Sequence, residues 1–302
     1  MKIPIITGPT ASGKSDIVLK LAEDLNAEII CMDSRQIYKE INIGTAKPNI
    51  YEMQKIKHHL FDIIDLKESF NAYEYVKLVD KTIKNIILRN KIPILTGGTG
   101  FYIDALTKGF FNVENNYSIR KYLENISLEK NLYQILKQID IDSYNRIHKN
   151  DKKRIIRALE IFLNTGKTMT YHMKKSILNK SNYDFQIIVL NRDRKNLHDR
   201  INKRVDKMIE NGLIEEVKSL KEKGYDPNLN ALNTIGYKEV FKYLDYNCDL
   251  KDTVENIKTN TRRYARRQII YFRHIKEAIW VELSSNNEEN KNKLIQIIKG
   301  GF

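Results

Sequence analysis

The chain has 302 residues, of which 41% are hydrophobic and 30% are charged. This composition excludes an intrinsically disordered protein and predicts either one large core or a core with a smaller second unit. No run of 18 apolar residues and no signal-peptide core occur, so neither a membrane span nor secretion is expected. The two cysteines, Cys31 and Cys248, are too few for a zinc finger or a disulfide scaffold, which favours the reducing cytoplasm. No pattern indicates an oligomer, so a monomer is expected.

The net charge is strongly positive, since 52 Lys and Arg face 38 Asp and Glu for a total of +14. A polyanionic partner such as a nucleic acid would explain this surplus, and so would compositional drift. The surplus is not spread evenly, however. Residues 112–182 carry a net charge of +7, and Lys258–Lys276 contains seven basic residues and no acidic one. We therefore expect these two stretches to contact a polyanion.

Strand and helix patterns alternate through the first hundred residues. Short apolar runs predict strands at Lys2–Thr7, Ala27–Met32 and Lys91–Thr96, and helical periodicity marks Lys14–Asn26 and Ala72–Arg89. Strands that alternate with helices are typical of a parallel sheet with crossover helices. The sequence therefore predicts an α/β core.

The middle of the chain has a different pattern. Leu132–Ile141 and Asp151–Asn164 have helical periodicity, and no convincing buried strand occurs near them. Phe185–Leu190 then has the apolar pattern of a core strand, and helical patterns follow it to about Lys276. The expected fold class is thus α/β, a P-loop core with a parallel sheet flanked by helices, plus a helical insertion domain. The expected boundaries are 1–111 and 183–302 for the core and 112–182 for the insertion.

A phosphate-binding loop lies between the first strand and the first helix. Residues 8–15 read GPTASGKS and fit the pattern GxxxxGK[ST]. In such a loop the backbone N–H groups and the helix N-terminus hold phosphate oxygens, so we expect Gly8, Pro9, Thr10, Ala11, Ser12, Gly13, Lys14 and Ser15 to bind a diphosphate. Lys14 would place a cation on the phosphates, and the Ser15 hydroxyl would ligate Mg²⁺, the expected cofactor. The alternative, a chance glycine-rich turn, does not explain the flanking strand and helix.

The loop is not accompanied by the usual metal-binding Asp of an ATPase. The apolar run Ile92–Leu95 ends in Thr96–Thr99, and Asp62 and Asp65 are weaker substitutes for the missing carboxylate. This favours a bound pyrophosphate that acts as a leaving group over hydrolysis of a nucleoside triphosphate.

Asp33 and Thr99 each follow a predicted strand. Ligands of open parallel sheets bind at the carboxyl ends of the strands, so both side chains are expected in the crevice that holds the phosphate loop. A carboxylate there can act as a general base toward a nucleophile that approaches the bound phosphates. The alternatives are a helix cap or surface turn for Asp33 and a tight turn without a ligand for Thr99.

Nine stretches in order resemble the tRNA dimethylallyltransferase (IPP transferase) family nearly end to end. Early in the chain they read GPTASGKS at Gly8, DSRQIY at Asp33, GTAKP at Gly44, HHLFDIID at His58 and PILTGGTGFY at Pro93. Later they read NDKKRIIRALE at Asn150, LHDRINKRVDKMIENG at Leu197, TIGYKE at Thr234 and TRRYARRQIIYFR at Thr261.

The resemblance implies transfer of a dimethylallyl group from dimethylallyl diphosphate to the exocyclic amine of the adenosine 3′ of a tRNA anticodon. In this family the phosphate loop grips the donor and Mg²⁺, and Asp33 matches the base that takes the proton from the amine. Thr99 matches a threonine that contacts the substrate nucleotide. Arg204 matches an arginine that closes on the diphosphate, with Arg200 one helical turn away. An anticodon-loop base can be splayed out to reach such a site.

The resemblance also implies contacts with the tRNA anticodon stem-loop. They fall on Asp33, Ser34, Arg35, Gln36, Thr99 and Arg120, then on Lys153, Arg154, Ile155, Ile156 and Arg157 of the insertion. They continue on Thr234, Ile235, Gly236, Tyr237, Lys238 and Glu239, and on the arginine-rich stretch with Arg262, Arg263, Arg266 and Arg267. Lys153 stands where the family usually has a glutamine. The alternative for all the basic residues is a solvated face, in which Arg200 and Arg204 would pair with Asp199 or Asp206.

Two other classes of function remain open at this stage, an enzyme with a different acceptor and a non-catalytic protein. An adenylate isopentenyltransferase or a P-loop small-molecule kinase would share the phosphate loop, but neither needs a basic insertion. A non-catalytic RNA-binding protein would not need Asp33 and Thr99 beside a phosphate loop.

Overall fold

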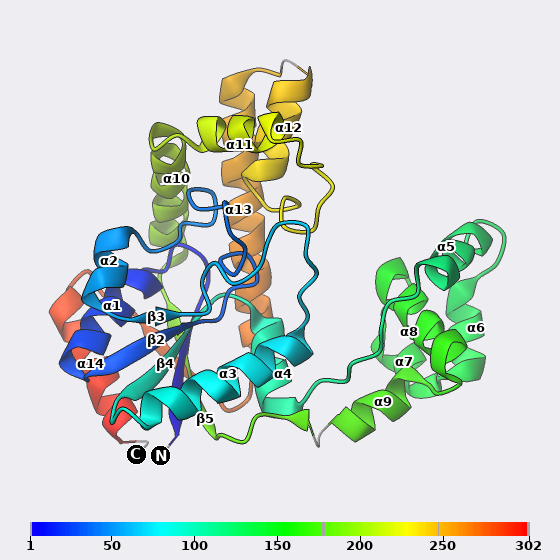
Figure 1. Ribbon diagram of the computed structural model, residues 1–302, viewed down its shortest axis with the longest axis horizontal. Coiled ribbons are helices and arrows are strands. Elements are labelled where there is room, and N and C mark those ends of the chain that lie inside the picture. The colour runs from blue at the N-terminus through cyan, green and yellow to red at the C-terminus, as the bar shows by residue number, and fades with distance from the viewer. Residues whose placement is uncertain (1, 177–178, 247, 301–302) are drawn as a thin grey trace. The chain divides into compact units, whose positions relative to one another are not determined.

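The computed structural model describes residues 2–176, 179–246 and 248–300, and it separates into two compact units (Figure 1). The first unit contains Met1–Ile103 and Asn182–Phe302, and the second contains Asp104–Ser181. The second unit begins earlier than the expected residue 112 because its two ends lie against each other. Ser181 N–H donates to the Leu106 carbonyl over 3.0 Å, and a Cβ on Gly109 would lie 1.9 Å from the Ser176 carbonyl oxygen.

A parallel sheet of six strands forms the centre of the first unit. The strands are β1 (Ile3–Thr7), β2 (Ala27–Cys31), β3 (His58–His59), β4 (Ile92–Gly97), β5 (Phe185–Asn191) and β6 (Ile279–Glu282). Their order in the sheet is β3-β2-β4-β1-β5-β6. The expected fold class and the four strands predicted from apolar runs are confirmed. The edge strands β3 and β6 are additional, and both are too short for a sequence pattern.

Helices connect these strands and pack on the sheet or on one another (Figure 1). They are α1 (Lys14–Asp24), α2 (Ile50–Lys55), α3 (Ala72–Ile87), α4 (Gly100–Lys108), α10 (Arg194–Glu210), α11 (Leu213–Glu222), α12 (Tyr237–Tyr246), α13 (Leu250–Phe272) and α14 (Asn287–Lys299). The first turn of α3 is fixed by a capping box between Asn71 and Glu74. No helix in the described ranges is both long enough and apolar enough to cross a membrane.

One hydrophobic core lies between the sheet and the helices α1 and α14. Ile6, Ile94 and Ile188 of three adjacent strands are buried there with Leu21 of α1 and Leu294 of α14. The central strands are buried on both faces, which explains their continuous apolar runs. As a result, the carboxyl ends of β1, β2, β4 and β5 are held rigidly at one edge.

Helices are the regular secondary structure among the described residues of the second unit. Its helices are α5 (Tyr117–Ile126), α6 (Leu132–Ile139), α7 (Ile141–Arg146), α8 (Lys152–Thr165) and α9 (Met169–Ser176). Leu123, Leu136 and Leu159 meet in its core. The single helix expected over Leu132–Ile141 is interrupted, because the Asp140 side chain accepts from Ser143 N–H and starts a new helix.

Candidate active site

The phosphate loop has the backbone shape that its glycines allow. A Cβ on Gly8 would lie 2.3 Å from the Leu190 carbonyl oxygen of β5, so only glycine fits there. Gly13, with φ of 96°, turns the chain into α1. The Lys14 ammonium donates to the carbonyls of Gly8 and Pro9, each over 2.8 Å. Lys14 is thus folded onto its own loop, within reach of any anion that the loop holds.

The surroundings of the Lys14 ammonium lower its pKa. Burial is the main reason that its pKa falls to about 7, and the nearby Arg204 guanidinium lowers it further, while the Asp33 carboxylate partly offsets both effects. Burial also lowers the pKa of Arg204, and Asp33 again acts in the opposite direction. Lys14, Arg204 and Asp33 therefore share one electrostatic environment, as expected for a site that binds a diphosphate beside a base.

Two further guanidinium groups hold the loop from the outside. The Nε–H of Arg200 donates to the Ala11 carbonyl over 2.8 Å, and that of Arg192 donates to the Ser12 carbonyl over 2.8 Å. Arg200 was expected here, whereas sequence reasoning missed Arg192. The sequence feature that could have indicated Arg192 is its position directly after β5, because the carboxyl end of β5 lies beside that of β1. Among the described residues, the alternative partner Asp206 does not pair with Arg200 or Arg204. Its carboxylate pairs with Lys258 over 2.8 Å.

Asp33 and Thr99 lie together, because β2 and β4 are parallel neighbours. The Thr99 hydroxyl oxygen accepts from Ser34 N–H over 3.0 Å, and Thr99 N–H donates to the Met32 carbonyl over 3.3 Å. The Asp33 carboxylate accepts from Arg35 N–H over 2.8 Å, which fixes the turn after the strand. No hydrogen bond among the described residues reaches the second carboxylate oxygen of Asp33, which can therefore accept from another donor. The two expected residues are thus brought together at the carboxyl edge of the sheet.

The remaining residues of the Asp33–Gln36 strip are tied into the protein. Arg35 donates to the Asn230 carbonyl over 2.5 Å. The Gln36 amide donates to the Thr45 and Ala46 carbonyls, each over 3.0 Å. The strip therefore has a fixed conformation, and Ser34 and Arg35 are half-buried rather than fully exposed.

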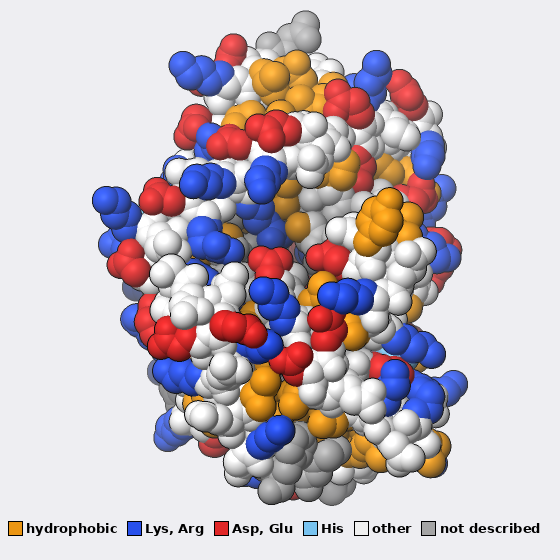
Figure 2. Space-filling view, turned by 90° about the vertical axis from the view of Figure 1, so that its left-hand side faces the viewer, with side chains coloured by type: hydrophobic (Ala, Val, Ile, Leu, Met, Phe, Trp, Pro, Cys, Tyr) orange, Lys and Arg blue, Asp and Glu red, His pale blue; other side chains and the backbone are white. Residues whose placement is uncertain are grey.

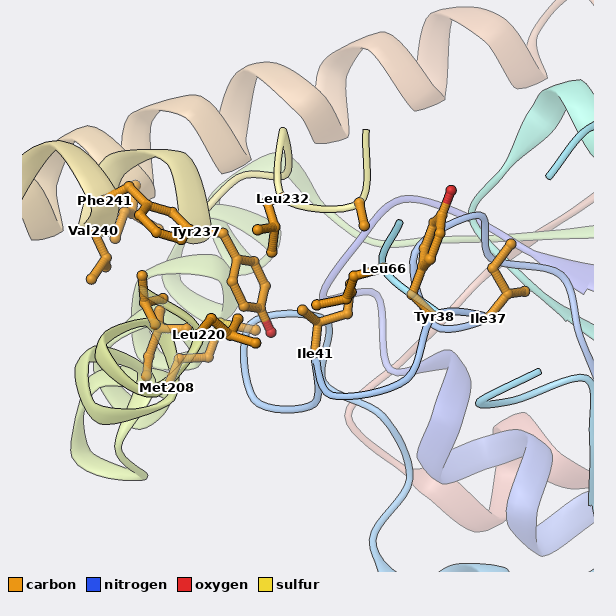
Figure 3. Packing of buried hydrophobic residues seen from close by; sticks show 14 of the residues in the cluster. Ile37, Tyr38, Ile41, Leu66, Met208, Leu220, Leu232, Tyr237, Val240 and Phe241 are labelled. Atoms are coloured by element: carbon orange, nitrogen blue, oxygen red, sulfur yellow. The ribbon is translucent and has the colours of Figure 1, made fainter. Parts of the chain in front are cut away.

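A second apolar cluster positions the Thr234–Glu239 segment, which runs from a turn into the start of α12 (Figure 3). The Tyr237 ring is buried beside Ile41 and Leu220, and its hydroxyl donates to a Glu216 carboxylate oxygen over 2.5 Å. The Glu239 carboxylate is also buried, and it accepts from Gly236 N–H over 2.7 Å. The Tyr237 and Glu239 side chains are therefore engaged inside the protein, and the tRNA contacts expected of these two residues stay predictions. Their neighbours Thr234, Ile235 and Lys238 are half-buried and keep partly accessible side chains.

The basic helix α8 of the insertion divides into two faces. Lys153 and Arg154 are exposed, whereas Ile155 and Ile156 are buried in the core of that unit. The Ile155 and Ile156 side chains face inward, as every third or fourth position of an amphipathic helix does, and the tRNA contacts expected of these two residues stay predictions.

Arg157 of α8 and Arg120 of α5 share one buried carboxylate. Glu160 accepts from Arg120 over 2.9 Å and pairs with Arg157 over 3.1 Å. Burial alone would raise the pKa of Glu160, but hydrogen bonds from Arg120 and Asn116 N–H and the charge of Arg157 lower it. Both arginines thus neutralise an internal charge, a structural role that sequence reasoning did not anticipate.

The arginine-rich helix α13 also has two kinds of arginine. Arg262 is half-buried and donates to the Asn202 side chain over 2.6 Å, which ties α13 to α10. Arg263, Arg266 and Arg267 are exposed, and within the described residues none of the three pairs with a carboxylate. By contrast, basic and acidic side chains are intermixed on the face shown in Figure 2.

Comparison with known proteins identifies the family. Residues 36–275 match the family model described as IPP transferase. The chain belongs to this family. The resemblance seen in the nine sequence stretches is therefore confirmed.

Relatives within the IPP transferase family extend over the whole chain. A tRNA dimethylallyltransferase of Petrotoga mobilis is 49% identical over 292 residues, with 95% of this chain and 96% of the relative covered. The tRNA dimethylallyltransferase of Thermotoga maritima is 46% identical over 306 residues, with 100% and 99% covered. The alignment with the Thermotoga maritima relative includes the phosphate loop and Asp33, which precede the segment matched by the family model.

Solved structures of the family share the fold. The full-length tRNA isopentenylpyrophosphate transferase of Bacillus halodurans has a TM-score of 0.73 at 36% identity and covers 99% of this chain and 96% of its own. A eukaryotic dimethylallyltransferase acting on tRNA has a TM-score of 0.79 at 30% identity, with 98% and 77% covered. The P-loop α/β fold expected from the sequence agrees with both.

The donor set at the start of α1 is compatible with Mg²⁺. Ser15 is exposed there, and no group of three His, Cys, Asp or Glu side chains in the described ranges could hold a metal by itself. Mg²⁺ commonly binds through one or two protein oxygens, several waters and the phosphates of a substrate. A hydroxyl beside a phosphate loop fits this mode of binding better than it fits a permanent metal site.

Proposed function

We propose that this protein transfers the dimethylallyl group of dimethylallyl diphosphate to the exocyclic amine of the adenosine 3′ of a tRNA anticodon. The observation that carries this proposal is the Asp33 carboxylate, which lies in the same electrostatic environment as Lys14 and Arg204 of the diphosphate site. Family membership supports the choice of substrates. The protein would bind the anticodon stem-loop and work as a monomer in the cytoplasm, where tRNA is modified.

The donor half of the reaction depends on neutralising the departing diphosphate. Lys14 would exchange its two carbonyl contacts for phosphate oxygens, and Arg204 would close on the same group. These cations stabilise charge that develops as the bond between the allylic carbon and the diphosphate oxygen breaks. Mg²⁺, held by Ser15 and the phosphates, would supply further charge neutralisation.

The acceptor half depends on Asp33 and Thr99. The adenine amine is a weak nucleophile because its lone pair is delocalised into the ring, so it needs a hydrogen-bond acceptor at the right place. Asp33 has one carboxylate oxygen on Arg35 N–H, and the other can accept the proton that the amine loses as its nitrogen bonds to the allylic carbon. Thr99 donates only weakly, over 3.4 Å, to the Ser34 hydroxyl, so its proton can orient the base.

The test of the proposed function uses labelled dimethylallyl diphosphate in separate reactions with unmodified tRNA, with AMP and with neither, and ATP is tested separately as a phosphate donor. We expect label in tRNA only. Label in AMP would establish an adenylate isopentenyltransferase, and phosphate transfer from ATP would establish a kinase. Binding of tRNA without any transfer would indicate a non-catalytic RNA-binding protein.

The exposed part of α8 gives a first prediction. Replacing Lys153 and Arg154 by alanine is expected to weaken tRNA binding and to reduce the salt slope of log Kd by about 0.7–0.9 per lost phosphate contact. A matched pair, Lys20→Ala with Lys293→Ala, removes the same charge from exposed positions of α1 and α14. Binding is measured between low and moderate salt. An equal change of slope in both pairs would show a general charge effect and not a contact made by α8.

The buried carboxylate beside that face gives a second prediction. Arg157→Ala is expected to destabilise the insertion by about 1–3 kcal/mol, because it leaves Glu160 with fewer partners. Replacement of the exposed Lys153 should change stability by less than about 0.5 kcal/mol. Urea unfolding measures both. Equal stability of the two variants would contradict the structural role of Arg157.

A further inference from the structure

One buried side chain joins the two loops of the active site. Gln268 lies on α13, the long orange helix in Figure 1, and is 6% exposed. Its carbonyl oxygen accepts from Thr10 N–H of the phosphate loop over 2.9 Å. Its amide nitrogen donates to the Gly98 carbonyl over 2.9 Å. Both ends of this single amide are therefore used, one on the donor loop and one on the acceptor loop.

The loop after β4 is shaped to receive α13. A Cβ on Gly98 would lie 2.3 Å from the Gln268 amide nitrogen, and one on Gly100 would lie 2.1 Å from the Tyr271 ring. The Tyr271 hydroxyl donates to the Gly100 carbonyl over 2.9 Å. Gln268 and Tyr271 are three positions apart on one helical face, so they hold the segment on both sides of Thr99. Thr99 is the residue expected to contact the acceptor base.

The contact with Thr10 sets the direction of a backbone group in the phosphate loop. Because Thr10 N–H is bonded to Gln268, it is directed at α13 and is not available to a phosphate oxygen. The remaining N–H groups of the loop and Lys14 must then supply the anion site. A substitution that removes the acceptor at residue 268 would free this N–H and alter the conformation that the loop presents to the diphosphate.

We propose that Gln268 is a positioning residue, which sets the distance between the diphosphate-binding loop and the loop that carries Thr99. It touches neither substrate in this role. Catalysis of group transfer is sensitive to such distances, because a misplacement of about 1 Å can cost about 100-fold in rate. The proposal rests on the proposed function, since it assigns the two loops to the donor and the acceptor.

The test compares three variants. Gln268→Met keeps the volume and loses both hydrogen bonds, whereas Gln268→Glu keeps an acceptor for Thr10 N–H but places a carboxylate oxygen against the Gly98 carbonyl. Thr253→Val is the control, because it removes a buried hydroxyl of the same helix that donates only to the Asp249 carbonyl. Single-turnover transfer, the Kd of tRNA, the KM of dimethylallyl diphosphate and thermal unfolding are measured for each.

We expect Gln268→Met to lower the single-turnover rate by about 10–100-fold and to raise the KM of the donor. The Kd of tRNA should change by less than about twofold, and Thr253→Val should keep the wild-type rate. Gln268→Glu should affect the rate strongly as well, because only one of the two loops stays held. A folded Gln268→Met variant with a normal rate at saturating substrates would overturn the proposal. So would a loss of rate that is explained by weaker tRNA binding alone. If the wild-type protein transfers no label to tRNA, the proposed function fails instead, and the two failures are thus distinguishable.

Discussion

Asp33→Asn is expected to lower the single-turnover rate of prenyl transfer to tRNA by about 10²–10⁴-fold, the usual range for loss of a general base. The asparagine oxygen can still accept from Arg35 N–H, so the turn after β2 should keep its shape. What the variant loses is the acceptor for the amine proton. Rapid-quench measurements with saturating donor and tRNA separate this chemical step from binding and product release.

Binding distinguishes a base from a structural carboxylate. The Asp33→Asn variant should bind tRNA and dimethylallyl diphosphate with Kd values close to those of the wild type, because no direct contact with phosphate is removed. Asp24→Asn is the matched control, since it breaks a surface pair with Lys291 at the far end of α1. A near-normal transfer rate in Asp33→Asn would refute the assignment of the base.

The parts of the site that could be predicted are those with short-range signals. The phosphate loop is a contiguous motif, so its glycines and Lys14 were found directly. Asp33 and Thr99 are distant in sequence, but each follows a buried strand, and parallel strand ends meet at one edge of a sheet. Their adjacency therefore followed from two apolar runs.

The parts that could not be predicted depend on packing between distant segments. Glu160 meets Arg120 across 40 positions of the chain, and Gln268 meets Thr10 across 258. Neither pairing leaves a periodic pattern in the sequence. The same limit applies to α14, which begins in a polar stretch and is held by burial of Leu294 and Ile298 on its apolar side. The family resemblance assigns tRNA contacts to whole stretches of sequence, and these stretches include residues with inward-facing side chains such as Ile155 and Tyr237.

The second large effect expected is on Lys14. Its pKa of about 7 in the free protein means that the ammonium is largely neutral at pH 8 and above. A bound diphosphate favours the charged form, so it should raise this pKa and bind together with a proton. The donor Kd should therefore increase with pH above about 7, by at most tenfold per pH unit, and approach a constant value with respect to Lys14 at lower pH.

Calorimetry in buffers of different ionisation enthalpy measures the proton directly, with an expected uptake that approaches one per donor bound near pH 8.5. Lys14→Arg should abolish the uptake, because a guanidinium keeps its charge throughout this range.

Lys14→Ala should raise the donor Kd by about 10–100-fold and lower the transfer rate by about 10²–10³-fold, since a charged contact to the leaving group is lost. Lys20→Ala, on an exposed position of the same helix, should leave both quantities and the pH dependence unchanged. Proton uptake that persists in Lys14→Arg would place the titrating group elsewhere in the site, because an arginine at this position is already protonated and cannot take up a proton.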